Sequence, residues 1–173
     1  MLKQLEKTLG GWYKNSPPLS KGLKEGLAKA ASWIAVVIGV FQVLAAWDMW
    51  SVMRVADRLR HNTEVLNQYY TKETVHSYGL GSSDRLLIYA SIVLLVISAV
   101  LLLTAYTELQ KRTRRGWELL FKAGTVYVVY LVLGLFINGR YHLDAMVINI
   151  ALVVAGFYVL FQVQDKFTGK STK

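Results

Sequence analysis

Few residues of this sequence are of a type and in a place to carry out chemistry, and the most conspicuous is Asp48. It stands between Trp47 and Trp50 in the stretch AAWDMWSVMR, at the end of a long apolar run. A carboxylate inside a membrane can carry protons or ions. Asp48, however, follows Lys29 by a separation that a helix rising 1.5 Å per residue converts to about 28 Å. This is close to the thickness of a hydrocarbon core. We therefore interpret Asp48 as an outer-interface residue, with the two tryptophans as aromatic anchors.

Three histidines form the next candidate group, because imidazole and carboxylate are common zinc ligands. His61, His76 and His142 all lie outside the apolar runs, near several acidic residues. Their spacing matches no ligand motif, so scattered surface residues are the preferred interpretation and a metal site is the alternative. The chain has no cysteine, which excludes disulfides and thiol chemistry. No nucleophile–base pair or phosphate loop appears, so we expect no cofactor and no enzymatic activity.

Two amides, Gln42 and Asn149, are the polar residues deepest in the apolar runs. Counted from opposite ends of their runs, they fall at similar depth in a core of about 30 Å. We expect both to face the interior of a helix bundle and to hydrogen-bond to each other. The alternative is that they line a path for a small solute or ion. No ionisable residue lies near the middle of a run, which argues against proton-coupled or cation-coupled transport.

Small residues recur on one side of two of these runs, at a spacing of four. Such stripes let helix backbones approach closely in lipid, where apolar burial drives little association. We expect them to pack helices together, either within one chain or between two protomers. The stripes are Ala31, Ala35 and Gly39 in the first run, and Ala151 and Ala155 in the last.

Four apolar runs must position these residues, and they define the class of the protein. The chain is 54% hydrophobic with a mean hydropathy of +0.34. An apolar helix of about 20 residues spans a bilayer, and the runs show almost no polar face. We predict an all-α fold, a single integral membrane domain over residues 1–173 built as a four-helix transmembrane bundle. The predicted membrane-spanning segments are 31–50, 86–106, 119–137 and 143–163.

Two segments outside the bundle are predicted to be helical as well. Residues 1–19 begin with leucines at helical spacing and lysines between them, which is typical of an amphipathic helix lying in the membrane interface. Gly10 and Gly11 are expected to end that helix. Beyond Trp50 the chain lacks glycine and proline as far as Tyr70. Residues 51–83 are therefore expected to extend the first helix outside the membrane to about Tyr70, followed by a loop.

The net charge of +9 reports topology when it is read by location. Most lysines and arginines lie in residues 1–30, in the segment 111–122 and in the C-terminal tail. By the positive-inside rule both termini are then cytoplasmic. The basic residues would attract anionic lipids on that side. They are not interleaved with stacking aromatics, so we expect no nucleic-acid partner.

The segment GWELLFKAGTVYVVYLVLGLF, residues 116–136, and the later FYVLFQVQDKF carry a resemblance. Together they resemble a loose group of small uncharacterised four-helix bacterial membrane proteins. The resemblance implies a bacterial cytoplasmic membrane and no activity. Trp117 at the start of the first segment is interpreted as an anchor at the inner interface.

These observations favour a non-enzymatic membrane protein that serves as an interaction, accessory or structural subunit. Its expected partners are the lipid bilayer and either another membrane protein or further copies of itself. An oligomeric channel or transporter for a small solute or ion is the second hypothesis, and a lipid-binding protein is the third.

Overall fold

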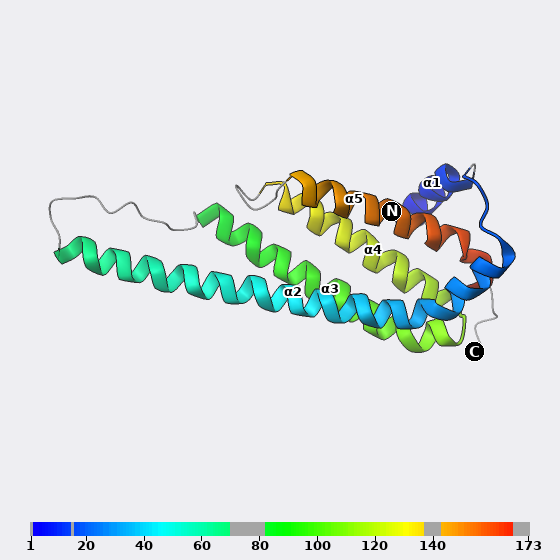
Figure 1. The fold of residues 1–173 in the computed structure, drawn as a ribbon, viewed down its shortest axis with the longest axis horizontal. Coiled ribbons are helices and arrows are strands. Elements are labelled where there is room, and N and C mark those ends of the chain that lie inside the picture. Colours follow the sequence, from blue (N-terminus) through cyan, green and yellow to red (C-terminus); the bar gives the residue numbers. More distant parts are fainter. Residues whose placement is uncertain (1, 15, 70–81, 137–142, 168–173) are drawn as a thin grey trace.

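The chain is all-helical wherever its structure is described. The computed structural model describes residues 2–14, 16–69, 82–136 and 143–167. Within these ranges it has five α-helices, one short 3-10 helix and no strand (Figure 1). The elements are α1 (Leu2–Lys14), α2 (Lys21–Tyr69), α3 (Ser82–Gln110), α4 (Arg114–Gly134), α5 (Leu143–Gln162) and η1 (Gln164–Phe167).

Three of these helices are long and apolar enough to cross a membrane, which is consistent with the predicted membrane class. They are Lys21–Leu59 in α2, Arg85–Gln110 in α3 and Arg114–Gly134 in α4. The described apolar part of α5, Val147–Gln162, is shorter. The described residues therefore supply three helices of spanning length, where the sequence predicted four.

Helix α2 is a single helix of 49 residues, about 70 Å long at 1.5 Å per residue. The Ser20 hydroxyl caps it by accepting a hydrogen bond from the Leu23 amide at 3.3 Å. The predicted continuation past Trp50 is confirmed, since the helix ends at Tyr69. The loop expected after it, residues 70–81, lies outside the described residues.

Helix α1 does not end at Gly10 and Gly11, and that prediction was wrong. The helix continues to Lys14 because its far end packs against the C-terminal part of α5. A side-chain carbon at Gly10 would lie 3.4 Å from the Phe161 ring, and the Tyr13 ring stacks on Phe161 with centroids 5.6 Å apart. These tertiary contacts outweigh a glycine cost of about 1 kcal/mol per residue.

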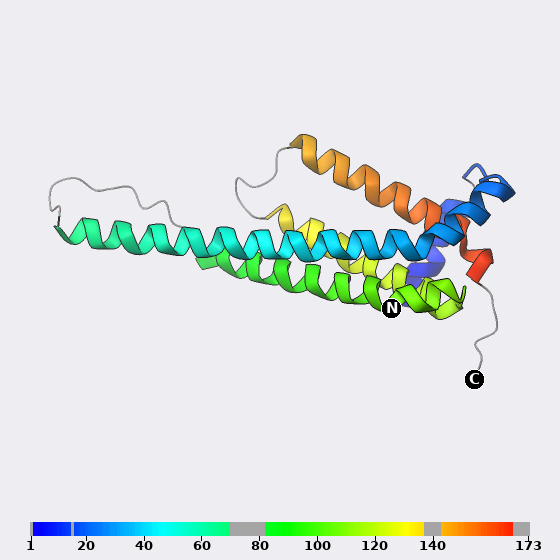
Figure 2. The same cartoon turned by 60° about the horizontal axis from the view of Figure 1, so that its bottom comes forward.

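Helices α2 and α3 lie side by side and antiparallel over most of the length of α3 (Figures 1 and 2). Their buried residues alternate at spacings of three and four, the seven-residue repeat of a coiled coil. On α2 these positions are Ala28, Ser32, Ala35, Gly39, Gln42, Ala46 and Met53. On α3 the series is Ile88, Ser91, Leu95, Ser98, Leu102, Ala105 and Leu109, with Ala99 buried beside it, and this face lies between α2 and α4.

The small residues of α2 make this close packing possible. Ala35 is fully buried, and a side-chain carbon at Gly39 would lie 3.2 Å from Leu103. The stripe predicted on α2 therefore packs against α3 within the chain. Helix α3 also contacts α4, where the Ser98 hydroxyl donates to the Ala123 carbonyl at 3.2 Å. Helix α3 is thus the central helix of three.

The turn between α3 and α4 is tight and depends on one glycine. Arg112 adopts a left-handed conformation with φ 53°, and the Thr113 hydroxyl caps α4 by accepting from the Gly116 amide at 3.2 Å. At Gly116 a side-chain carbon would lie 2.8 Å from backbone atoms of Glu108 and Leu109. No real side chain fits at that separation, so the turn requires glycine.

Helix α5 packs most closely on the other helices at its C-terminal end, although Asn149 in its N-terminal half still reaches Tyr127 of α4. Figure 2 shows its C-terminal half close to α1 and the start of α2, whereas its N-terminal half diverges from α2 and α4. We call the end of the bundle with α1, η1 and the α3–α4 turn the closed end, and the opposite end the open end. Near the open end Val147, Ile148 and Leu152 are each at least 60% exposed.

Replacing Gly116 tests the geometry of the turn. Gly116→Ala should lower the free energy of unfolding by about 1–3 kcal/mol, since the added carbon meets backbone that cannot move aside cheaply. Gly26→Ala is the matched control, because a side-chain carbon there meets nothing within 4 Å. The control should gain up to about 1 kcal/mol. Tryptophan fluorescence during denaturation in mixed micelles measures both, and equal effects would contradict the proposed contact.

Candidate interaction surfaces

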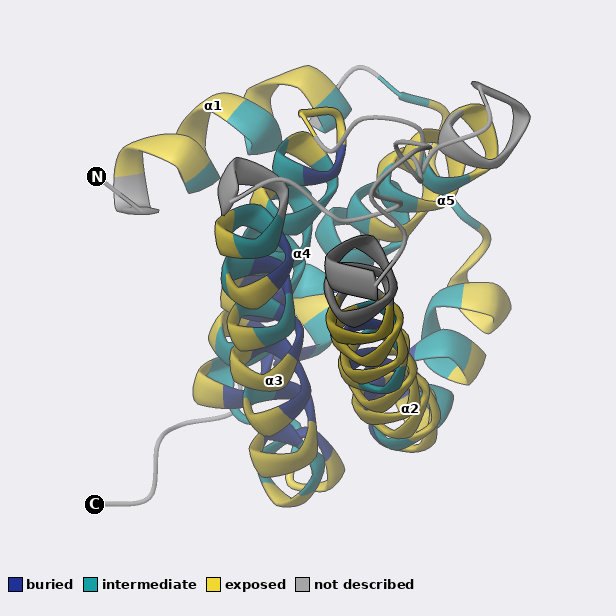
Figure 3. Ribbon diagram, turned by 90° about the vertical axis from the view of Figure 1, so that its left-hand side faces the viewer, coloured by how far each residue is buried: buried dark blue, intermediate teal, exposed yellow. Residues whose placement is uncertain are grey.

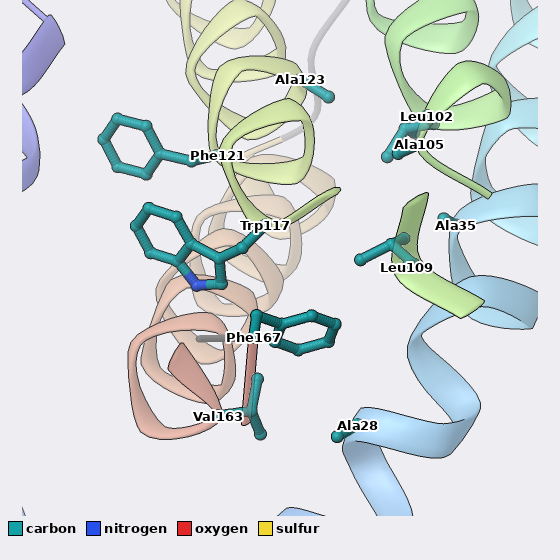
Figure 4. Close-up of a cluster of buried hydrophobic side chains, with 10 residues drawn as sticks. All are labelled: Ala28, Ala35, Leu102, Ala105, Leu109, Trp117, Phe121, Ala123, Val163 and Phe167. Carbon is teal, nitrogen blue, oxygen red and sulfur yellow. The ribbon is translucent and has the colours of Figure 1, made fainter. Parts of the chain in front are cut away.

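The closed end holds the main buried core of the protein, to which every described helix contributes a buried or partly buried side chain. Figure 4 shows Leu109 of α3, Trp117 of α4 and Phe167 of η1 converging there. Each of the three is at most 1% exposed. Leu9 of α1 packs against the edge of the same cluster. This core fixes the relative positions of segments from both ends of the chain.

Trp117 is the centre of this core and not an exposed anchor, which corrects our interpretation from the sequence. Its indole Nε1 donates to the Leu160 carbonyl of α5 at 2.8 Å. Its ring stacks on Phe121 with centroids 5.5 Å apart and meets Phe161 edge-on at 5.7 Å. The Arg114 guanidinium covers the ring at 4.4 Å from its centroid. A tryptophan near the end of an apolar run looks the same in sequence whether it faces lipid or a neighbouring helix.

Arg114 also connects α1 to the bundle, a role that the sequence gave no sign of. Its guanidinium pairs with the Glu6 carboxylate of α1, and Gln164 Nε2 donates to the same carboxylate at 3.3 Å. Arg114 Nε also lies 3.6 Å from the carboxylate of Glu118, one turn further along α4. Glu6 and Arg114 are far apart in sequence, so only the fold brings them together.

Two further hydrogen bonds attach the N-terminal segment to α5. The Tyr13 hydroxyl donates to the Val154 carbonyl at 3.2 Å, and the Tyr158 hydroxyl donates to the Pro17 carbonyl at 2.5 Å. Burial raises the pKa of Tyr13 above its ordinary value, so its hydroxyl remains a donor at neutral pH. Helix α1 therefore lies as a strap across the closed end.

Below this strap the surface is hollowed by an open cavity of about 760 Å³. Its walls combine the aromatic rings of Phe121 and Phe161 with charged side chains of both signs. The charged residues are Glu6, Lys7, Arg114, Glu118 and Lys122. Arg114 is paired with Glu6 and Glu118, so Lys7 and Lys122 carry the remaining positive charge above the apolar floor, which gives the cavity the character of a site for an anionic amphiphile. It contains no nucleophile paired with a base.

A second ion pair closes the same end from the side of α2. The Arg112 guanidinium donates to Glu25 Oε1 at 2.6 Å. Arg112 owes its position to the left-handed turn described above, so one strained residue joins the start of α2 to the α3–α4 turn. Both side chains are partly exposed, so solvent screens the pair and its contribution to stability is small.

Near the open end, Asp48 lies on the exposed side of α2 and not in the bundle. Its backbone carbonyl accepts from the Ser51 hydroxyl at 2.8 Å, and its side chain is exposed. Arg85 at the start of α3 pairs with Asp57 at 2.7 Å. Trp47 and Trp50 are 65% and 40% exposed. These exposures agree with an interface position for the stretch and give Asp48 no neighbouring group with which to do chemistry.

The structure places the two intramembrane amides in different surroundings. Gln42 is buried in the contact between α2 and α3 at 7% exposure, and its Oε1 accepts no hydrogen bond from the described residues. Asn149 Oδ1 on α5 accepts from the Tyr127 hydroxyl of α4 at 3.3 Å. The expected hydrogen bond to Gln42 Oε1 is therefore not formed. Similar depth did not bring the two amides together, because depth says nothing of which way each helix is turned.

The candidate metal ligands do not come together in the described part of the chain. His61 is exposed on α2, while His76 and His142 lie outside the described residues. Among residues 2–14, 16–69, 82–136 and 143–167 no group of three His, Asp or Glu side chains could hold a metal ion.

The small-residue stripe of α2 is largely buried, whereas the stripe of α5 is exposed. Ala35 and Gly39 of α2 are covered by α3, as described above. Ala151 and Ala155 of α5 are exposed, and a side-chain carbon at Gly156 would meet nothing within 4 Å. At 100° per residue, Ala151 and Ala155 fall opposite Val153 and Phe157, and Phe157 packs on α4. The α5 stripe is therefore a close-packing surface that this chain leaves uncovered.

No known protein family matches the sequence, and no curated protein or solved structure shows significant similarity to it. The resemblance to small four-helix bacterial membrane proteins remains a prediction.

The unpaired Gln42 oxygen leads to a sharp test. Gln42→Met keeps the volume and removes a buried acceptor without a partner, so it should raise the free energy of unfolding by about 1 kcal/mol or more. Asn149→Leu is the control, because it deletes an amide that has a partner and should lower stability by about 0.6 kcal/mol. Denaturation in mixed micelles measures both changes. A loss of stability in Gln42→Met would mean that a further group satisfies this oxygen.

Proposed function

We propose that this protein is a non-enzymatic interaction subunit of the membrane, which binds a transmembrane helix of another protein on α5. The observation that carries the proposal is the uncovered stripe of Ala151 and Ala155, beside a helix pair in which the equivalent stripe is covered. In lipid such small-residue faces are where helices approach most closely. A large exposed apolar surface on α5 is otherwise left to lipid alone.

The proposal includes a topology with four membrane spans. Helix α5 has 20 residues, about 30 Å in length, which is enough for a hydrocarbon core. The basic residues of the α3–α4 turn and of the N-terminal segment support a cytoplasmic closed end with both termini inside. In this arrangement α1 lies along the inner surface of a bacterial cytoplasmic membrane, and α2 extends beyond the outer surface.

Attachment of α5 mainly at the closed end supports this function further. The bonds from Trp117 and Tyr13 hold its C-terminal half, while no comparable set of contacts holds the described residues of its N-terminal half. A partner helix can thus lie against the exposed face without displacing the core. The rigid part of the bundle then acts as the base on which the partner is held.

The test is isolation of the whole protein in native lipid particles, followed by mass spectrometry of what accompanies it. The double variant Ala151→Leu/Ala155→Leu should reduce the recovered partner at least tenfold, because the larger side chains keep helix backbones apart. Val147→Leu is the matched control, since Val147 is already a large side chain at 65% exposure. Recovery of the same partner with both variants, or of none from the unaltered protein, would contradict the proposal.

A lipid-binding role is the second candidate, favoured by the cavity beneath α1. Lys7, Arg114 and Lys122 lie where phosphate groups of anionic lipids are expected if the closed end is cytoplasmic. Phe121 and Phe161 offer an apolar floor to the start of an acyl chain. Retention of anionic phospholipid through purification, lost in Lys7→Gln/Lys122→Gln, would support this function and leave the α5 surface unaffected.

A further inference from the structure

Two pairs of aromatic rings join α2 to α3 at matching heights. The Trp33 and Tyr106 rings meet edge-on with centroids 5.7 Å apart, and the Trp50 and Tyr89 rings do so at 6.1 Å. The two pairs are equally far apart on both helices, by a separation that a rise of 1.5 Å per residue converts to about 26 Å. Tryptophan and tyrosine gather at the two edges of a bilayer. The pairs therefore bound a layer close in thickness to a hydrocarbon core, which we call the apolar band.

The side chains within the apolar band have the character of a surface that faces acyl chains. The sequence has no charged residue between Lys29 and Asp48 on α2, or between Arg85 and Glu108 on α3. Figure 3, viewed from the open end, shows exposed residues over most of α2 and along the outward side of α3. The large exposed side chains there are Ile34, Val37, Ile38, Val40, Phe41, Val43 and Leu44 of α2, and Val93, Val96, Ile97, Val100 and Leu103 of α3.

The apolar band also selects one part of the long apolar stretch of α2. The stretch of spanning character, Lys21–Leu59, has 39 residues, or nearly 60 Å at 1.5 Å per residue. A hydrocarbon core of about 30 Å covers only half of that length. The aromatic pairs place the covered half between Trp33 and Trp50, so Val55 lies beyond the outer edge.

One lysine of α4, Lys122, falls inside the apolar band. Two contacts give its height relative to α3. Gly116 lies against the Glu108 backbone, and the Ser98 hydroxyl donates to the carbonyl of the residue that follows Lys122. Interpolation at 1.5 Å per residue puts Lys122 about 6–10 Å further into the band than Tyr106. A lysine at that depth is costly unless water or an anion accompanies it.

The cavity beneath α1 reaches Lys122 at this depth, and α1 forms its opposite wall. The Tyr13 hydroxyl of α1 bonds to the Val154 carbonyl of α5. Val154 lies about 9 Å further into the band than Leu160, whose carbonyl accepts from Trp117 near the inner edge. An interfacial amphipathic helix typically sinks about 5–10 Å below the headgroups. The polar walls of the cavity therefore extend below the inner edge that Trp33 and Tyr106 mark on the other side of the bundle.

The charges that line this cavity leave a single net positive charge. The Arg114 guanidinium is paired with the Glu6 and Glu118 carboxylates, and Lys7 and Lys122 are exposed to the cavity from opposite walls. One phosphodiester group carries the single negative charge that balances this set. The volume of about 760 Å³ holds such a group together with several waters, each of which occupies about 30 Å³.

We propose that this cavity is a water-filled recess sunk into the inner leaflet, and that it takes the phosphate group of one anionic lipid between Lys7 and Lys122. The start of the acyl chains then lies against Phe121 and Phe161. This inference rests on the proposed topology and deepens the proposed lipid-binding role by giving the depth of the site. In the competing arrangement Lys122 extends its amine along the helix to the headgroups, and lipid fills the space beside its stem.

Single cysteines test the depth and hydration of the recess, because the sequence contains none. A charged maleimide, added to broken membranes that hold the whole protein, reacts only with thiols that water reaches. Lys122→Cys should react at least tenfold faster than Val100→Cys, the matched control at similar height on the lipid side of α3, where Val100 is 53% exposed. Val55→Cys, beyond the outer edge, should react as fast as a thiol in water. Reaction in denaturant confirms that every thiol is intact.

Two results of this labelling would overturn the inference. Equal, slow reaction of Lys122→Cys and Val100→Cys would show that lipid fills the space beside α4. Fast reaction of Val100→Cys, or slow reaction of Val55→Cys, would show that the aromatic pairs do not mark the edges of the bilayer. Retention of anionic lipid together with a slow Lys122→Cys would leave the lipid-binding role standing without the recess. The partner surface of α5 is unaffected in each case.

A phosphatidylglycerol with a photoreactive headgroup tests the ligand. In vesicles that contain the whole protein, its cross-links should map to residues 114–122 and fall at least fivefold in Lys7→Gln/Lys122→Gln. Lys111→Gln/Arg115→Gln is the matched control, since it removes the same charge from exposed residues of the closed end outside the cavity. An equal loss in both variants would overturn the site by showing only general attraction to a basic surface. Suppression by added inorganic phosphate would overturn the lipid as the source of the phosphate group.

Discussion

The antiparallel contact between α2 and α3 is the interaction on which the rest of the structure depends. In lipid, apolar side chains gain little from leaving their surroundings, so close packing must supply the attraction. Ala35 and Gly39 allow that packing by bringing the α2 backbone near Leu103. Helix α3 also packs against α4, and the short turn at Arg112 aligns α4 with it. The aromatic core around Trp117 forms only because these three helices are already in place.

The bundle is consequently asymmetric along its length. At the closed end, segments from the beginning, middle and end of the chain converge on one core and are joined by Arg114, Tyr13 and Arg112. At the open end, the described part of α5 diverges and α2 continues alone. Stability is thus concentrated at one end and accessible surface at the other. Such a division suits a protein that holds its own shape while leaving helix faces available to others.

The sequence predicted those features that follow from local composition. The apolar runs identified the membrane class, and the absence of glycine and proline after Trp50 predicted the length of α2. The sequence did not predict those features that depend on contacts between residues far apart in the chain. Gly10 and Gly11 are weak helix formers locally, but Phe161 lies against the helix they belong to. Trp117 resembles an interface residue until Leu160 accepts its hydrogen bond. Gln42 and Asn149 were expected to hydrogen-bond because they lie at similar depth. The rotation of each helix depends on packing, however, and it turns the two side chains toward different neighbours.

The unbroken course of α2 has a mechanical consequence. A helix without glycine or proline from Val40 to Tyr69 resists bending and twisting, so it transmits movement along its length. Near the base of the same helix, Glu25 pairs with Arg112, the left-handed residue of the α3–α4 turn. The chain thereby contains a stiff helical segment about 45 Å long, continuous with a helix base that is joined by an ion pair to the turn between two other helices. A movement of the outer part of α2 would therefore reach the α3–α4 turn through this ion pair.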